Sequence, residues 1–355
     1  MTIKIMPKVT MSEWVRNLQK GYRVIGPKPI SGQYVFGDIQ SASELALDYA
    51  SSILPPKKIL LPQCEPLIQF DTSKNQHQIE SLFEDRPTVI LGLHTCDLHA
   101  IALLDRAFGS GQPDQHYLTR RKNATIVTIE CLQPCSEHSF CKSMDTLSTH
   151  GDFDLHMTDL GDMFAIDIGS NSGVNLLWDF AGIRDVNQED LQRLQRVMSE
   201  KWQRFPYKLN FDVSELPSLL ELSYDSELWD ELGEQCLACG ICTIVCPTCY
   251  CFDVRDEVDL TLQYGRRLRV WDSCQLDPFA MVAGGHNFRA SQSARIRHRF
   301  FHKGKYQLEA FGIVGCVGCG RCAQACLVNI SPIEVFNELH RRRAPSARMK
   351  QELRI

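Results

Sequence analysis

The sequence predicts an α/β domain with a partly parallel sheet over residues 1–215, followed by a mostly α-helical domain over residues 216–355. Two observations predict the first domain: short apolar runs typical of buried strands, and an amphipathic helical segment between two of them. A third observation predicts the second domain, because two cysteine runs of identical spacing stand 69 residues apart among helix-forming segments. The boundary is placed in the proline-bounded stretch from Pro206 to Pro217.

Two short strands and a helix are predicted near the start of the chain. Tyr22–Ile25 and Gln33–Phe36 have the composition of strands, and the proline and glycine residues between them favour a turn. Ser41–Ile53 is rich in Ser, Ala and Leu, which indicates a helix.

The centre of the first domain follows as strand, helix and strand. Thr88–Leu93 is a continuous apolar run, which is typical of a strand buried on both faces. Asp97–Phe108 has apolar residues at helical spacing, and Ala124–Glu130 is a second buried strand that ends just before Cys131. This order predicts a right-handed βαβ unit and therefore a parallel sheet. A further strand and an amphipathic helix are predicted at Met163–Ile168 and Val186–Trp202.

Both cysteine runs have the spacing C-x2-C-x2-C-x3-C, which holds [4Fe–4S] clusters in bacterial-type ferredoxins. In two-cluster ferredoxins the fourth cysteine of each run binds the cluster of the other run. The predicted ligands are therefore Cys236, Cys239, Cys242 and Cys326 for one cluster, and Cys316, Cys319, Cys322 and Cys246 for the other. The long gap between the runs favours a helical two-cluster, ferredoxin-like fold. Structural zinc is the alternative, but zinc needs no fourfold run ending in Cys-Pro.

Four of the remaining cysteines are predicted to hold a third [4Fe–4S] cluster. Cys96 and Cys131 follow the C-terminal ends of two predicted strands, so both thiols are expected at one edge of the parallel sheet. The loop after Cys131 adds Cys135 and Cys141. The alternative is that all four are ordinary buried thiols, which are common in cores. Three others are expected to line the first cluster without ligating another: Cys249, Cys251 and Cys274.

The composition excludes several classes of protein. An apolar fraction of 44% over 355 residues is ordinary for a folded chain of about two domains, and the net charge of −5 does not favour nucleic acid. The sequence contains no run of eighteen apolar residues, so no membrane span is predicted, and the start of the chain has no apolar signal core. Sixteen cysteines in such a chain are best explained as metal ligands in a reducing cytoplasm.

A basic segment near the second run has three possible roles. Its members are Arg289, Arg295, Arg297, His298, Arg299, His302, Lys303 and Lys305. They could form a solvated helix face, compensate the negative charge of the clusters, or dock an acidic partner. No complete dinucleotide-binding or phosphate-binding glycine motif is present, so no nucleotide site and no catalytic residue are predicted.

Several segments of the chain have a pattern found in known proteins: CLACGICTIVCPTCYCFDVRDEV, RLRVWDSC, GHNFR, RIRHRFFHK and GCVGCGRCAQAC, with LGLHTCDLHAI, YLTRRKNATIVTIEC and CKSM before them. In these segments the chain resembles the iron–sulfur β subunits of cytoplasmic NAD(P)-linked nickel–iron hydrogenases, the sulfhydrogenases. It is also similar to the corresponding iron–sulfur subunit of anaerobic sulfite reductases, in the same family of 4Fe–4S dicluster proteins. Two positions depart from the family pattern, since Leu327 replaces a proline and Ser139 replaces a cysteine.

The resemblance implies a non-catalytic electron-transfer subunit of an oxidoreductase complex. Such a subunit relays electrons between an NAD(P)H-linked flavoprotein subunit and a catalytic subunit, here that of a nickel–iron hydrogenase. One alternative is the same relay in an anaerobic sulfite reductase or a heterodisulfide-reductase-like complex. Another is an independent flavin-containing oxidoreductase, against which the missing nucleotide motifs weigh.

Overall fold

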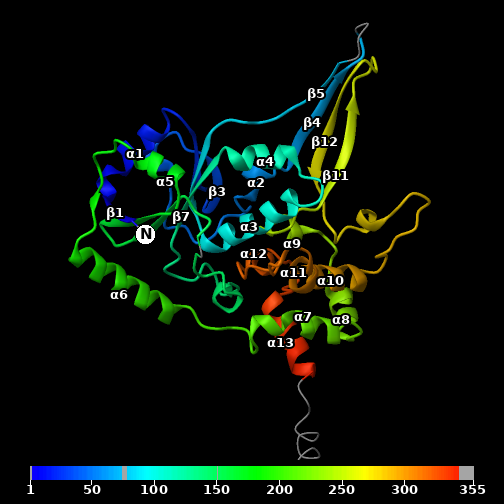
Figure 1. The fold of residues 1–355 in the computed structure, drawn as a ribbon. Coiled ribbons are helices and arrows are strands. Elements are labelled where there is room, and N and C mark those ends of the chain that lie inside the picture. Colours follow the sequence, from blue (N-terminus) through cyan, green and yellow to red (C-terminus); the bar gives the residue numbers. More distant parts are fainter. Residues whose placement is uncertain (1, 74–77, 150, 344–355) are drawn as a thin grey trace, which may run out of the picture. The chain divides into compact units, whose positions relative to one another are not determined.

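The structure is a computed structural model, and it describes residues 2–73, 78–149 and 151–343. The chain forms two compact units (Figure 1). The first unit comprises Met1–Cys135, Thr146–Phe205 and Pro247–Asp272, and the second comprises Ser136–Asp145, Pro206–Cys246 and Ser273–Ile355. The segment between the two cysteine runs thus contributes 26 residues, Pro247–Asp272, to the first unit.

The main sheet of the first unit has eight strands in the order β10-β1-β9-β8-β7-β6-β2-β3. Their bounds are Thr2–Pro7 (β1), Arg23–Ile30 (β2), Gln33–Asp38 (β3), Thr88–Leu93 (β6), Ala124–Ile129 (β7), Leu155–Asp159 (β8), Met163–Ile168 (β9) and Arg184–Asp185 (β10). The pairs β2–β6, β6–β7 and β7–β8 are parallel, and the outer pairs are antiparallel. The prediction of an α/β domain with a partly parallel sheet is confirmed.

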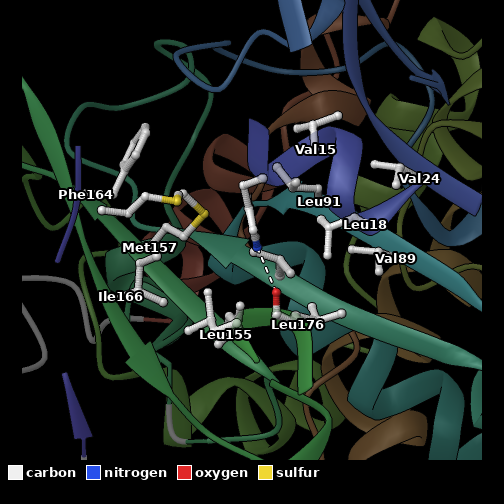
Figure 2. Packing of buried hydrophobic residues seen from close by; sticks show 14 of the residues in the cluster. Val15, Leu18, Val24, Val89, Leu91, Leu155, Met157, Phe164, Ile166 and Leu176 are labelled. Atoms are coloured by element: carbon white, nitrogen blue, oxygen red, sulfur yellow. Dashed lines mark hydrogen bonds between the residues drawn. The ribbon is translucent and has the colours of Figure 1, made fainter. Parts of the chain in front are cut away.

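Helices cover both faces of this sheet. They are Met11–Leu18 (α1), Lys57–Leu60 (α2), Thr95–Gly109 (α3), Gln115–Lys122 (α4), Asn171–Leu177 (α5) and Gln188–Arg204 (α6). Side chains alternate across a strand, so Val89 and Leu91 of β6 pack in one cluster with α1 and α5. Ile90 packs in another cluster with α3 and α4. Figure 2 shows the first cluster, in which Val15 and Leu18 lie close to Leu91 and Val89.

A second sheet in the first unit joins residues that are far apart in the sequence. It has the order β11-β12-β4-β5, with all pairs antiparallel. The bounds are Cys64–Asp71 (β4), Gln78–Ser81 (β5), Phe252–Val258 (β11) and Tyr264–Trp271 (β12). Glu65 on β4 is buried and accepts a hydrogen bond of 2.7 Å from Arg269 on β12. Arg120 donates to the other carboxylate oxygen of Glu65, so the inserted hairpin is held by a buried charge network.

The predicted helix over Ser41–Ile53 is wrong. Only Ala42–Glu44 forms a turn of 3-10 helix, and several residues that follow it bond to strands of the first unit's main sheet. The Ala46 N–H donates to the carbonyl of Pro27 at 2.9 Å, and the buried Tyr49 hydroxyl donates to the carbonyl of Gly92 at 2.9 Å. These tertiary contacts override the helical propensity of the segment.

The second unit contains the helices Leu216–Leu222 (α7), Leu228–Gln235 (α8), Ile241–Ile244 (α9), Gln292–Phe301 (α10), Gln307–Phe311 (α11), Arg321–Gln324 (α12) and Pro332–Arg343 (α13). A π-helical turn, His302–Tyr306, joins α10 to α11. Its core gathers Trp229 from α8, Phe300 and Phe301 from α10, and Phe336 from α13.

Candidate metal centres

The two cysteine runs adopt the same local backbone in the second unit. Gly240 and Gly320 precede the short helices α9 and α12, with φ of +78° and +76°. This left-handed conformation favours glycine, and the same turn stands at the same place in both runs. The helices α9 and α12 also contact each other, which brings the two runs together.

Four thiols from the two runs line one cavity in this unit. Cys236, Cys239 and Cys242 come from the first run, and Cys326 comes from the second. The cavity encloses about 500 Å³, part of it open to solvent, and Ile296, Phe300 and Ile330 supply apolar walls. These four cysteines are the first set predicted from the sequence.

The pKa values of the thiols reflect the same pairing across the runs. Burial raises the pKa of Cys236, and the thiols of Cys239 and Cys326 raise it further. Burial also raises the pKa of Cys242 to about 12. Burial thus favours the uncharged form of both thiols, against the opposing charge of Arg299. A metal centre reverses this preference, because a coordinating thiol is deprotonated outright.

The second predicted set is also brought together in part. Burial raises the pKa of Cys316 to about 12, with further contributions from the thiols of Cys322 and Cys246. Burial likewise raises the pKa of Cys322, to which Cys246 again contributes. The last cysteine of the first run therefore lies beside the second run. Cys319 is half-buried on the same turn as Cys316 and Cys322.

The third predicted set is divided between the units. Cys96 is buried in the first turn of α3, and Cys131 is buried just after β7. The Cys131 sulfur lies 3.9 Å from the Thr95 hydroxyl, and the Cys135 sulfur lies 3.6 Å from Nδ1 of His94. Cys131, Cys135 and His94 line one cavity of the first unit, of about 900 Å³ with its open part. Cys141 begins a 3-10 helix of the second unit.

The three cysteines expected around the first cluster are placed as follows. Cys274 is buried, and its thiol contributes to the raised pKa of Cys242, so it lies near the first set. Cys249 and Cys251 belong to the first unit. The carbonyl of Cys249 accepts a hydrogen bond of 2.6 Å from the buried Lys57 ammonium, and that of Cys251 accepts one of 3.0 Å from the Asp272 N–H.

The basic segment contains the site residue that the sequence did not single out. Arg295, Arg299 and Lys303 recur every four residues and are only 6%, 8% and 6% exposed, so this stripe is not a solvated face. Arg299 lines the cavity of the first thiol set and also hydrogen-bonds the thiol of Cys322 in the second. The four-residue spacing was the available signal, because it places these side chains on one face of a helix.

The donor chemistry fits iron–sulfur clusters. Thiolates are soft ligands that suit such clusters, and the glycine turns leave the cavity wall free of side chains at Gly240. Among residues 2–73, 78–149 and 151–343, no three His, Cys, Asp or Glu side chains converge on one point as they do around a single ion. The four thiols of the first set instead surround a cavity.

Comparison with known proteins agrees with this chemistry. Residues 235–330 match the family model of the 4Fe-4S dicluster domain. The chain is 37% identical over 328 residues to sulfhydrogenase 2 subunit beta of Pyrococcus furiosus. The aligned region covers 92% of this chain and 95% of the relative. No solved structure matches the chain. None of the helices in the described part of the chain is both long and apolar enough to cross a membrane. The identity and its coverage show that the chain belongs to the sulfhydrogenase β-subunit family of iron–sulfur proteins.

Proposed function

We propose that this chain relays electrons between an NAD(P)H-linked flavoprotein subunit and the catalytic subunit of a nickel–iron hydrogenase. The observation that carries the proposal is the cavity lined by cysteines of both runs, within a segment that matches a 4Fe–4S dicluster domain. The similarity to a sulfhydrogenase β subunit favours hydrogenase over sulfite reductase as the partner enzyme. The chain itself supplies the relay and no substrate site.

The ligand sets that we propose are those of a ferredoxin-like helical dicluster domain within residues 216–355. Cys236, Cys239, Cys242 and Cys326 hold one [4Fe–4S] cluster, and Cys316, Cys319, Cys322 and Cys246 hold the other. Cluster chemistry supplies one-electron transfer. The protein residues bind the iron, exclude water with the apolar walls, and keep the two sites adjacent through the contact of α9 with α12.

A third [4Fe–4S] cluster is proposed for Cys96, Cys131, Cys135 and Cys141, which all lie within the α/β domain that we propose for residues 1–215. The cavity beside Cys131 and Cys135 supports a site at this edge of the sheet. His94 stands 3.6 Å from Cys135 and stacks on Tyr49, with ring centroids 4.1 Å apart. These contacts hold His94 next to the thiols.

The ligand proposal is tested by iron content and EPR of anaerobically purified protein. The wild type should contain about twelve irons per chain, and about eight if the third site is absent. Cys239→Ser and Cys319→Ser should each remove the EPR signal of a different cluster. Replacing all four cysteines of the third set with serine should remove about four irons. Cys64→Ser is the matched control, because Cys64 is exposed and outside all three sets. Unchanged iron in every variant would contradict the assignment.

The relay is tested with the native complex. Its subunits should include a flavoprotein and a hydrogenase catalytic subunit when the complex is purified without oxygen. The chain alone should not pass electrons from NADH or NADPH to a viologen dye, but it should do so when the flavoprotein is added. Dye reduction by the isolated chain would show an independent nucleotide site and would contradict the proposed role.

A further inference from the structure

Arg299 differs from the other two members of the buried basic stripe in what its side chain meets. Arg295 forms an ion pair of 2.8 Å with Asp277, and the Lys303 ammonium lies 3.2 Å from Oε1 of Gln307. Arg299 is directed to the cysteines, where it lines the cavity that holds the first thiol set. Its guanidinium also lies 5.3 Å from the ring centroid of Phe300, so one side of the group is packed against an aromatic face.

The same guanidinium acts on both thiol sets. In the first set it lines the cavity together with Cys236, Cys239, Cys242 and Cys326. In the second set it donates a hydrogen bond to the thiol of Cys322. One buried cation is therefore shared by thiols from both runs.

A shared cation of this kind has a redox consequence. Arginine stays protonated at every accessible pH, and its charge is felt strongly where water is excluded. Reduction adds one negative charge to a cluster, so a nearby fixed positive charge stabilises the reduced state. The net charge around a cluster and the hydrogen bonds to its sulfurs are the features that set its potential.

We propose that the two clusters share Arg299, and that its buried charge raises the reduction potentials of both. Its hydrogen bond to Cys322 adds to the effect at the second cluster. The inference rests on the proposed function, because it concerns clusters held by the two thiol sets. It goes beyond that function by naming the residue that keeps two adjacent clusters reducible together.

The test is an EPR-monitored redox titration of the anaerobically purified full chain. Arg299→Gln removes the charge and keeps a polar side chain of similar shape. Both midpoint potentials should become more negative, each by at least about a tenfold change in the reduction equilibrium, which is 59 mV for one electron. Arg297→Gln is the matched control on the same helix. The Arg297 guanidinium lies 4.1 Å from the ring centroid of Tyr224, and its removal should leave both potentials unchanged.

The outcomes separate this inference from the proposed function. Iron is counted first, and a wild type without about eight irons in the two sites would refute the relay itself. A loaded Arg299→Gln variant with unchanged potentials would overturn the role of Arg299 and leave the relay intact. If that variant holds too little iron, Arg299→Lys decides, since lysine keeps the charge but not the planar fork. A potential that is unchanged at the first cluster and lowered at the second is then expected. An equal drop at both clusters would overturn the proposal, because the charge is kept.

Discussion

The two cysteine runs share one backbone and differ in what covers it. In both, a residue in the left-handed region follows the first cysteine by two positions, with φ of +51° at Ala238 and +66° at Gly318. In both, the N–H of the fourth cysteine donates to the carbonyl three residues earlier, at 3.3 Å for Cys246 and 3.1 Å for Cys326. The two runs of equal spacing thus share the same local backbone.

The first run is covered by side chains and remains partly open. A side-chain carbon at Gly240 would lie 3.0 Å from the side chain of Ser273 and 3.6 Å from that of Leu276. Cys239 is exposed, and the apolar residues beside it are exposed as well, with Leu237 at 57% and Leu327 at 69%.

The second run is covered by backbone. A side-chain carbon at Gly318 would lie 2.7 Å from the backbone nitrogen of Cys141, and one at Gly320 would lie 2.7 Å from the carbonyl of His138. The Phe140 N–H donates to the carbonyl of Gly318 at 2.7 Å. Val317, which corresponds to Leu237, is only 3% exposed. The surroundings, and not the spacing, therefore decide which site meets solvent, and the first is the better placed to exchange electrons with a partner.

The largest effect is expected from Gly318→Ala. The added carbon meets backbone atoms that cannot rotate away, and φ at this position is unfavourable for alanine. The second site should lose about four irons, as measured by iron content and EPR. Ala238→Gly is the matched control in the first run and should keep its iron. A full iron content in Gly318→Ala would show that the backbone of residues 138–141 is not tightly packed on the second run.

A smaller difference is expected in the rate at which oxidants destroy the two clusters. Susceptibility to oxidation follows exposure, so the site that contains Cys239 should lose its signal at least about tenfold faster than the site that contains Cys319. Rapid mixing with ferricyanide followed by EPR measures both rates in one sample. Equal rates would mean that the second site is as accessible as the first.

The smallest effect is expected from Thr243→Ala, which gives the first run the residue found in the second run at Ala323. The Thr243 hydroxyl is buried, 2.7 Å from the Ser273 hydroxyl and 2.8 Å from the carbonyl of Gly240. Its loss should cost about 1 kcal/mol of unfolding free energy, seen as a lower thermal midpoint. In a double-mutant cycle, the variant with both Thr243→Ala and Ser273→Ala should lose less unfolding free energy than the sum of the losses in the two single variants. Strict additivity would argue against this hydrogen bond.

The sequence predicted the elements whose signal is local. The strands β6 and β7 were predicted from their apolar runs, because every residue of both strands is buried. The helix α3 between them was predicted from the helical spacing of its apolar residues. The parallel pairing of β6 with β7 agrees with the predicted βαβ unit. The cross-run proximity of Cys236 and Cys326 also agrees with the motif. The ligand sets themselves stay predictions until iron is measured.

The elements that were missed depend on distant partners. β12 contains the polar sequence Arg266-Arg267-Leu268-Arg269, which has no apolar strand signal. It is a strand because Arg269 pairs with Glu65, 204 residues earlier in the sequence. Arg299 was predicted only as one member of a basic segment. Its spacing marks one face of a helix, but its place beside the cysteines depends on residues that are distant in the sequence.

The hairpin β11–β12 also has a consequence for how the protein matures. The chain passes between the two units five times, and the excursion of Pro247–Asp272 falls after the first cysteine run and before the second. With cross-run ligands, the first run has no complete site until the ribosome has made the 80 residues that end at Cys326, which takes about 4–16 s at roughly 5–20 residues per second. Iron delivery then acts only after the hairpin and the second run have been made, and loading closes a loop of iron–thiolate bonds that contains the hairpin in sequence. A truncated second unit expressed from residue 216 would carry the hairpin without the strand β4 that it pairs with.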